Sequence, residues 1–482
     1  MNFQIIVRFT GILTFFLGLS MGAPLAVSLL FEDNCTQPLI LAMAITCFLG
    51  IILFAFTKNQ KEKQLNHRDG IAIVTLGWMM AGLVGALPFL FAGVTPGFTD
   101  ACFESISGFT TTGASIITDI ESLPEGILLW RSLTQWLGGM GIIVLSIAIL
   151  PFLGIGGMQL YKAEIPSPVV DKLKPRISET ARILWKIYLL ITLLQVALLL
   201  GGGMSLFDAV CHAFCTMPTG GFSTQNASIA QYNNAYYDFV IVIFMLLAGI
   251  NFSLHYRLLK GDLKIFGKDS ECRVFLIMVG AFILLVTLDI YGDVYKSLFQ
   301  AFRFAAFQVS SIITTTGFVS ADYEKWPHFS QLILLVCMFL GAMAGSTGGG
   351  IKIVRIILMV KHGYQQIFRI IHPHAVTTVK LNGQAVSTDV LGSIWGFFFL
   401  YMGLFVVASL VMAGLGLNFI TSISSVAASI GNIGPGFGLV GPIRNYLEIP
   451  MAGKWVLISC MLLGRLEIYT VIVLLVPEYW RR

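Results

Sequence analysis

Four short segments of the sequence combine glycine with threonine, asparagine or proline. Glycine permits backbone angles that aim successive carbonyl groups at one point, and threonine adds hydroxyl oxygens there without adding a charge. A ring of such uncharged oxygens can replace the hydration shell of a potassium ion. We call the segments loops 1 to 4. The candidate ligands are Thr111, Thr112 and Gly113 in loop 1 (110–113), Thr219 and Gly220 in loop 2 (218–222), Thr315, Thr316 and Gly317 in loop 3 (314–318), and Asn432, Ile433 and Gly434 in loop 4 (432–436).

The four loops recur at near-equal spacing along the chain. A single Thr-Gly turn would mean little, because such turns are common, but four in matching positions indicate an internal repeat. None of the loops contains an acidic residue, which argues against a divalent-cation site. Loop 2 replaces a threonine with Pro218, and loop 4 uses Asn432 and Pro435, so we expect a ring without four equal geometries.

Each loop ends an apolar stretch that is too short to cross a membrane and too apolar for an ordinary surface loop. We expect a short helix followed by irregular backbone in each stretch. Irregular backbone at membrane depth is stable only where it lines water or is buried in protein. The carbonyl ends of four such helices, aimed at the membrane centre, would favour a cation. The stretches are 98–116, 205–224, 296–319 and 417–438.

The composition is typical of a helical membrane protein. Of 482 residues, 56% are hydrophobic and 11% are charged, against roughly 25% charged in soluble domains. Long charge-free runs predict an all-α polytopic fold with ten transmembrane helices. The predicted helices are 8–31, 38–57, 70–93, 127–157, 183–203, 236–258, 272–291, 329–362, 389–413 and 454–477.

The short stretches alternate with these spans, which predicts four helix–pore loop–helix repeats in a pseudo-fourfold arrangement around a central pore. Two further helices precede the first repeat. The predicted division is 1–68 for the N-terminal helices and a cytoplasmic loop, 69–158 for repeat 1, 159–262 for repeat 2, 263–363 for repeat 3 with the glycine break, and 364–482 for repeat 4.

Lys and Arg concentrate in alternate loops, and the intervening loops are acidic. The positive-inside rule therefore predicts a multi-pass membrane protein with both termini in the cytoplasm. The first apolar run is longer than a signal-peptide core, so we expect it to be the first transmembrane helix. The net charge of +5 follows from this topology and gives no reason to expect nucleic-acid binding.

A run of small residues interrupts the predicted span 329–362. Glycine disfavours helix by up to about 1 kcal/mol relative to alanine, so the run predicts a break below the loops, across the path of an ion. The alternative is a tight helix–helix crossing, which requires small residues four apart rather than consecutive ones. We expect the break to act as a gate on this path, followed by the segment Lys352–Lys361. The gating residues are Gly345, Ser346, Thr347, Gly348, Gly349 and Gly350.

Arg465 lies near the middle of the last predicted span. A charge at that depth is costly unless it is paired or faces water. We expect Arg465 to face the pore or the gating segment, and Glu467, two residues on, to point to another face of the helix. The alternative is a structural ion pair within the helix bundle.

Two smaller groups of polar residues have both structural and functional interpretations. Cys211, His212 and Cys215 could ligate a metal, but thiols packed on an apolar helix are the favoured interpretation. Asp100 and Asp208 precede short helices, where they could attract cations or cap the helix.

Three further stretches carry a family resemblance together with the loops. They are Gln135–Gly141 (QWLGGMG), Gly345–Lys352 (GSTGGGIK) and Gly464-Arg465. With them, the whole chain resembles the Trk, Ktr and HKT superfamily of potassium transporters. Two helices before the first repeat are similar to the TrkH/TrkG branch.

The resemblance implies several properties. Each subunit would form one pseudo-fourfold pore, two subunits would form a homodimer, and a cytosolic TrkA-type nucleotide-binding ring would regulate them. The family's filter glycines carry over to Gly113, Gly220, Gly317 and Gly434. Glycine at position 113, where some sodium-favouring relatives have serine, supports potassium as the transported ion.

Three classes of function remain to be compared. The first is potassium uptake driven by the membrane potential, and the second is a proton- or sodium-coupled potassium symporter. Inverted repeats with a midplane site are typical of symporters, whereas these repeats are parallel, yet the sequence leaves channel and symporter open. The third is a membrane enzyme. The sequence contains no nucleophile–base pair, metal-ligand cluster or phosphate-binding loop, so we predict no enzyme activity and no organic cofactor. The predicted partners are a second subunit, the TrkA-type ring and membrane lipids.

Overall fold

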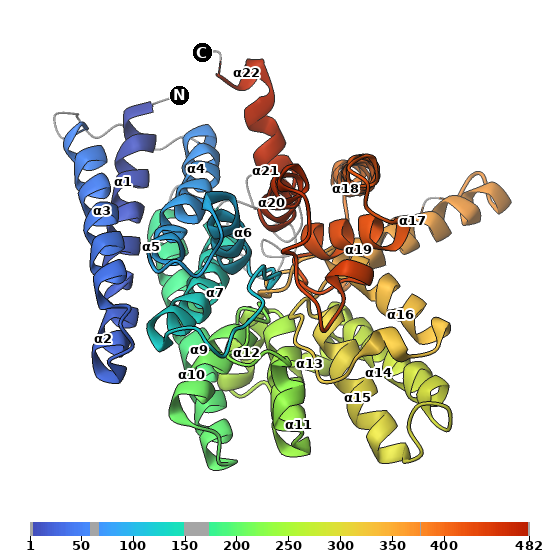
Figure 1. Cartoon of the computed structure of the whole chain (residues 1–482). Helices are drawn as coiled ribbons and strands as arrows, with labels where there is room; N and C mark the ends of the chain where they lie inside the picture. Colours follow the sequence, from blue (N-terminus) through green and yellow to red (C-terminus); the bar gives the residue numbers. More distant parts are fainter. Residues whose placement is uncertain (1–2, 58–66, 149–172, 376, 481–482) are drawn as a thin grey trace.

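The computed structural model describes residues 3–57, 67–148, 173–375 and 377–480. These residues form an almost wholly helical protein (Figure 1). The sheet within this part of the chain is one two-stranded hairpin, β1 (Lys380–Leu381) and β2 (Gln384–Ala385).

The N-terminal helices stand at one edge of the molecule (Figure 1). They are α1 (Phe3–Ser20), α2 (Gly22–Phe31) and α3 (Thr36–Ala55). α1 and α3 pack closely because glycines face the opposite helix. A Cβ atom on Gly18 would lie 2.5 Å from the Cys47 sulfur, and one on Gly50 would lie 2.6 Å from the Phe15 nitrogen. Small residues at such crossings are how helices pack in a membrane, where no hydrophobic effect drives association.

The middle of the chain supplies two pairs of long helices, each with a short helix between. The elements are α4 (His67–Gly85), α5 (Leu87–Phe91), α6 (Phe98–Phe109), α7 (Glu125–Ala148), α9 (Leu173–Gly201), α10 (Leu206–Thr216), η3 (Ser228–Tyr232), α11 (Ala235–Gly249), α12 (Phe252–Leu259) and α13 (Ile265–Lys268).

The C-terminal half continues the same alternation. The elements are α14 (Ser270–Ile290), α15 (Leu298–Ile313), η4 (Tyr323–Lys325), α16 (His328–Phe339), α17 (Ile353–Ile371), α18 (Thr388–Gly414), α19 (Phe419–Ile430), η5 (Gly438–Val440), α20 (Met451–Arg465), α21 (Tyr469–Ile472), η6 (Val473–Leu475) and α22 (Pro477–Trp480). α1 begins and α22 ends at the same end of the molecule, where the rings of Phe3 and Trp480 stack with centroids 5.8 Å apart (Figure 1).

Six described helices are long and apolar enough to cross a membrane, and two bent helix pairs bring the number to eight. The predicted unbroken spans 236–258 and 454–477 are wrong. α11 and α12 meet at 102°, and α20 meets the α21–η6 segment at 108°. The first bend occurs because the Asn251 side chain accepts a 2.9 Å hydrogen bond from the Ser253 amide and starts a new helix. The second contains Glu467 in a left-handed conformation, φ 59°.

Two predicted spans are only partly matched. Span 127–157 begins as α7, and its last residues lie outside the described part of the chain, as do basic residues in 58–66 and 159–172. Span 329–362 is divided into α16 and α17 by an irregular segment, as predicted from its glycines. Ten transmembrane helices therefore stay a prediction.

The short helices α6, α10, α15 and α19 begin at exposed residues and end inside the molecule. In α6, all residues from Thr99 to Phe109 except Asp100 are buried, and in α19 all from Thr421 to Ile430 except Ile423 are buried. α15 is buried from Ala305 to Ile313. The polar side chains near the C-terminal ends of these helices are thus removed from bulk water. The chain positions four helix ends at its centre, which is the arrangement that a convergent site requires.

Candidate ion-coordinating site

The four short helices end in one shared backbone conformation. Just after the helix, one residue adopts left-handed angles, and two residues later a glycine has a positive φ. The same sequence of angles in all four places makes the loops structural equivalents. The left-handed residues are Thr111 (φ 52°), Thr219 (58°), Thr315 (60°) and Asn432 (55°), and the glycines are Gly113 (79°), Gly221 (81°), Gly317 (80°) and Gly434 (101°).

Backbone hydrogen bonds at each helix end produce this conformation. In loop 1, the Thr111 amide donates to the Gly108 oxygen (2.9 Å) and the Thr112 amide to the Ser107 oxygen (2.8 Å), which is a Schellman motif. Its left-handed position is usually glycine, and a non-glycine residue there costs of order 1–3 kcal/mol. Three threonines at this position show that the surroundings fix the backbone. The equivalents of the second bond are Gly220 to Cys215, Thr316 to Ser311 and Ile433 to Ala428, each 2.8 Å.

Loop 2 contains two adjacent glycines, and the structure distinguishes them. The Gly220 amide makes the bond to Cys215 that Thr112 makes to Ser107 in loop 1. The positive φ belongs to Gly221. The glycine equivalent to Gly113 is therefore Gly221, and the prediction of Gly220 for that position is wrong by one residue.

The four loops form a closed ring. A Cβ atom built on each glycine would collide with a backbone oxygen of the next loop, in the order 1 to 2 to 3 to 4 and back to 1. Glycine is thus required at each position for two reasons: the backbone has a positive φ, and a backbone oxygen of the next loop leaves no room for a Cβ atom. The contacts of that Cβ atom would be Gly113 with Gly220 O at 2.0 Å, Gly221 with Thr316 O at 2.0 Å, Gly317 with Ile433 O at 1.8 Å, and Gly434 with Thr112 O at 2.7 Å.

The threonine side chains in the ring have two different roles. The hydroxyl of Thr112 lies 2.8 Å from that of Thr110 and accepts a 2.9 Å hydrogen bond from Asn432 Nδ2. It therefore braces the helix ends. The hydroxyl of Thr111 has no hydrogen-bond partner in the described structure although it is buried. A buried hydroxyl without a partner is costly, and of these three threonines it is Thr111 whose hydroxyl no described protein group satisfies.

A cavity opens on one side of the ring. All four positive-φ glycines line it, together with residues that follow them in the chain. Gly221 lines it and Gly220 does not, which agrees with the equivalence assigned from the backbone. The ring therefore has an accessible mouth on the side toward which the chain leaves the glycines.

The predicted gating segment lies against the opposite side of the ring. It connects α16 to α17, and its Gly349 amide donates a 2.7 Å hydrogen bond to the hydroxyl of Thr315. Thr347 Oγ1 donates a 2.9 Å hydrogen bond to the Met217 oxygen, just before loop 2. A Cβ atom on Gly349 would lie 2.4 Å from the Gly431 oxygen, just before loop 4. Contacts with three of the four helix ends place the segment directly beneath the ring.

Arg465 holds this segment from below. Its Nη1 donates a 2.6 Å hydrogen bond to the Thr347 oxygen, and the Lys352 ammonium donates to the Gly348 oxygen. The Arg465 side chain is buried, and its Nε and Nη2 have no hydrogen-bond partner in the described structure. Glu467 pairs with Arg355 instead of Arg465. The expectation that Arg465 meets the gating segment is confirmed, but it lies at the end of α20 and not in the middle of an unbroken span.

The ring and the segment beneath it can be compared with known proteins. A family model for TrkH, described as a cation transport protein, matches residues 36–482. The chain belongs to the TrkH family. Because the match includes nearly the whole described chain, the loops and the gating segment lie within the part that defines the family.

Individual relatives agree with this assignment over their whole length. The Trk system potassium uptake protein TrkH of Escherichia coli (strain K12) is 42% identical over 491 residues, with 100% of both chains covered. The potassium uptake protein TrkG of the same strain is 36% identical, with 99% of both covered. The crystal structure of the potassium transporter TrkH from Vibrio parahaemolyticus matches with a TM-score of 0.92 and 39% identity over 100% of both chains. The names of these relatives are those of transporters, in agreement with the prediction that this TrkH-family chain is not an enzyme.

The stretch Gln135–Gly141 in this TrkH-family chain supports the ring from behind. Gln135 Nε2 donates a 2.7 Å hydrogen bond to the Gly220 oxygen, and its Oε1 accepts a 3.1 Å bond from the Phe222 amide. A Cβ atom on Gly138 would lie 1.9 Å from the Phe109 oxygen, and one on Gly139 would lie 2.4 Å from Pro218. Small residues thus let α7 contact loops 1 and 2 at once.

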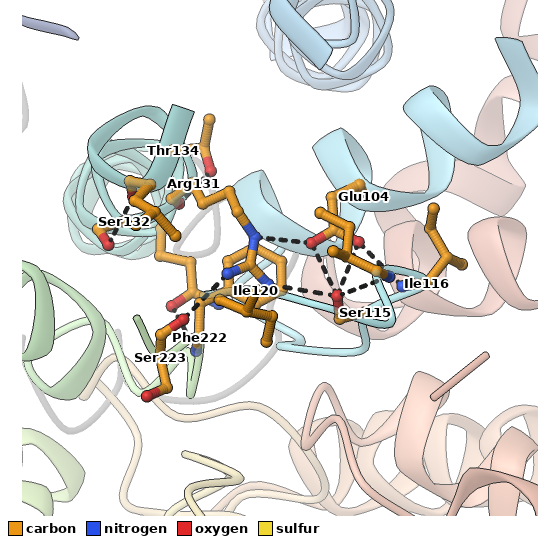
Figure 2. Close-up of polar contacts among 12 residues, drawn as sticks. Glu104, Ser115, Ile116, Ile120, Arg131, Ser132, Thr134, Phe222 and Ser223 are labelled. Carbon is orange, nitrogen blue, oxygen red and sulfur yellow. Dashed lines mark hydrogen bonds and ion pairs between the residues drawn. The ribbon is translucent and has the colours of Figure 1, made fainter. Parts of the chain in front are cut away.

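A buried ion pair beside the ring was not predicted from the sequence. Arg131 Nε lies 2.9 Å from Glu104 Oε1, and both side chains are almost fully buried. Figure 2 shows the pair between α6 and α7, with Ser115, Phe222 and Ser223 around it. Charged residues inside two predicted membrane helices were a signal of this pair, but each helix carries two of them, Asp100 and Glu104 in α6 and Glu125 and Arg131 in α7, and the sequence does not show which charges meet.

Glu271 is a second residue that the sequence analysis missed. Its Oε1 accepts hydrogen bonds from the amides of Ala344 (2.8 Å) and Val354 (3.1 Å). These two residues flank the gating segment: Ala344 directly precedes Gly345, and Val354 is the second residue of α17. One carboxylate therefore holds both ends of the segment, and its position in the second residue of α14 resembles ordinary helix capping in sequence.

The smaller polar groups have structural roles. No group of three potential metal-ligating side chains occurs within the described ranges, and the His212 ring bonds to the Asp208 oxygen and to Ser223 instead. Asp100 accepts a 2.5 Å hydrogen bond from Lys454, and Asp208 a 2.6 Å bond from Thr224. Both aspartates are thus occupied by protein partners.

Proposed function

We propose that this chain is the ion-translocating subunit of a potassium uptake system in the bacterial inner membrane. The closed ring of four glycine loops is the observation that carries the proposal, because each loop presents backbone oxygens to a neighbour around one axis. Relatives that match over their full length are named as potassium uptake proteins, which supports potassium as the transported ion. We propose the predicted filter residues as its ligands, with Gly221 added and Gly220 contributing its carbonyl.

The chemistry of the ring supports a monovalent cation. Its oxygens are carbonyls and hydroxyls, which can replace a potassium hydration shell. The carboxylate beside it, Glu104, is paired with Arg131, so it adds little net negative charge. A divalent ion would be expected to need carboxylate ligands at the ring.

We further propose that the segment from Gly345 to Gly350 is a gate. It lies beneath three of the four helix ends, and Arg465, Lys352 and Glu271 hold it there. α17 begins shortly after the segment, and the residues at the C-terminal end of α17 are exposed. A cytosolic TrkA-type nucleotide-binding ring that moves α17 would displace the segment and open the path.

The membrane potential supplies enough free energy for uptake. One positive charge moving through 100 mV yields about 2.3 kcal/mol. The parallel arrangement of the loops favours this mechanism over coupled symport, and a dependence of uptake on external protons or sodium would favour symport. The homodimer, the cytoplasmic termini, the surrounding lipids and the predicted division into four repeats, 69–158, 159–262, 263–363 and 364–482, belong to the same proposal.

Uptake of rubidium and sodium into cells that lack their own potassium systems tests the filter. We expect wild type to accumulate rubidium in preference to sodium. Gly113→Ser and Gly317→Ser should lose that preference, because each places a Cβ atom within about 2 Å of the next loop's oxygen. Gly383→Ser is the matched control: its φ is 82°, but nothing lies within 4 Å of its Cβ position. Unchanged ion preference in both ring variants would contradict the filter assignment.

A further inference from the structure

One position recurs at the same distance before each ring glycine. It is occupied by Glu104, His212, Gln308 and Ser425. Glu104 bonds to Ser115 and Ile116, beyond Gly113, and His212 bonds to Ser223, beyond Gly221. Gln308 contacts Ser320, beyond Gly317. In these three repeats a polar side chain on the short helix holds the chain that leaves the ring, and only the first uses a charge.

The charge in the first repeat is held by many short contacts. Glu104 Oε2 accepts hydrogen bonds from the Ile116 amide (3.0 Å) and the Ser115 hydroxyl (3.1 Å). Its Oε1 accepts from Arg131 Nε (2.9 Å). The Glu104 side chain is 0% exposed, so these partners replace water completely.

Arg131 connects this group to the second loop. Its Nη1 donates a 3.0 Å hydrogen bond to the Ser223 oxygen, and its Nη2 a 3.2 Å bond to the Ser115 hydroxyl. The guanidinium lies 4.2 Å from the centroid of the Phe222 ring. Figure 2 shows the guanidinium between the two exit segments, with one edge toward Glu104 and Ser115 and another toward Ser223. One side chain therefore ties the residues after Gly113 to those after Gly221.

We propose that the Glu104–Arg131 pair determines ion selectivity by fixing the separation of loops 1 and 2. The pair touches no ring oxygen itself, so both are positioning residues. They act through Ser115, Phe222 and Ser223, which lie within two residues of the ring glycines. The ring oxygens can discriminate against a smaller ion such as sodium only if their spacing does not shrink around it. A planar group with several directed donors resists such adjustment better than a flexible one. The inference rests on the proposed function of the ring.

The test compares Glu104→Gln and Arg131→Lys with wild type in the full-length protein. The readout is the ratio of rubidium to sodium uptake, together with the amount of folded protein in the membrane. Glutamine keeps the size of Glu104 and removes its charge, and lysine keeps the charge of Arg131 but cannot reach all three partners at once. We expect each substitution to lower the rubidium-to-sodium uptake ratio by about tenfold. A change of that size follows when the difference between the binding free energies of the two ions changes by the strength of one strong hydrogen bond.

The Asp238–Arg303 pair provides a matched control. Its Oδ2–Nε distance is 2.6 Å, its side chains are 2% and 11% exposed, and it joins α11 to α15 away from the residues that leave loops 1 and 2. Asp238→Asn should lower the amount of folded protein as much as Glu104→Gln does, with an unchanged ion ratio. Ser115→Ala removes the hydroxyl shared by Glu104 and Arg131 and gives the same readout if either charge variant fails to fold.

The outcomes separate this inference from the proposed function. A wild type that takes up neither rubidium nor potassium would contradict the proposed function. A selective wild type with an unchanged ratio in folded Glu104→Gln, Arg131→Lys and Ser115→Ala would overturn the inference alone. Equal loss of selectivity in Asp238→Asn would also overturn it, because the effect would then be a general one of buried charge.

Discussion

Arg465 Nη1 donates a 2.6 Å hydrogen bond to the backbone oxygen of Thr347, so the C-terminal helix pair is tied to the segment beneath the ring. The bond starts from the last residue of α20, immediately before the chain bends by 108°. Arg465 therefore lies at the end of α20 that is nearest the segment, and the chain turns away directly after it. A displacement of the segment that we propose as a gate would therefore break or strain a contact with α20.

The first prediction concerns this bond. Arg465→Gln should raise rubidium uptake about tenfold or more, because a hydrogen bond from a charged group contributes about 1.5–3 kcal/mol and here stabilises the closed segment. Uptake is measured at equal amounts of protein in the membrane. Arg465→Lys keeps the charge, and its rubidium uptake should lie between that of wild type and that of Arg465→Gln. Wild-type uptake in folded Arg465→Gln would show that the bond does not hold the gate.

The second prediction concerns the gating segment itself. Deletion of residues 345–350 should raise uptake, because it removes the backbone that lies against three helix ends. Thr347→Val is a smaller change. It removes the hydroxyl that donates a 2.9 Å hydrogen bond to the Met217 oxygen, and the increase in uptake should be several-fold smaller than that of the deletion. A folded deletion variant with unchanged uptake would contradict the gate.

The third prediction concerns Glu271, which is buried and accepts from the amides at both ends of the segment. Glu271→Ala leaves the buried amide of Val354 and the partly buried amide of Ala344 without this partner, at up to about 1–3 kcal/mol each. We expect a lower melting temperature and higher basal uptake. Glu271→Gln keeps one acceptor oxygen and should show a smaller change in both. A lower melting temperature with wild-type uptake would make Glu271 a stabilising residue only.

The fourth prediction tests which glycine of loop 2 belongs to the ring. Gly221→Ala should abolish selective uptake, because its φ is 81° and its Cβ atom would lie 2.0 Å from the Thr316 oxygen. Gly220→Ala requires no positive φ and would meet the end of the Gln135 side chain at 2.4 Å instead of a backbone oxygen of the next loop, so it should keep more of the selectivity. Equal effects of the two substitutions would contradict the assignment.

The elements that repeat could be predicted from the sequence. Four Thr- or Asn-containing glycine loops behind short apolar stretches, and a glycine run inside a long one, are visible in composition alone. The structure brings all four loops together and places the run beneath them. Arg465 was recognisable because an arginine within an apolar helix requires a partner.

The features that depend on backbone angles or distant partners could not be predicted. Two adjacent glycines in loop 2 give the same sequence pattern in either register, and only the bond from Gly220 to Cys215 distinguishes them. The bends after Gly249 and Arg465 occur at Asn251 and Glu467, and a single polar residue inside a long apolar stretch does not by itself distinguish a bend from a straight helix. Glu104 and Arg131 belong to different helices, and sequence spacing does not pair them.

The closure of the ring has a consequence for how the protein is made. Gly434, in the last loop, faces the Thr112 oxygen in the first, so the ring is incomplete until the C-terminal quarter of the chain has been inserted. A partly synthesised chain therefore cannot close the ring. If the ring is the ion filter that we propose, selective conduction is expected only after the last loop has been inserted.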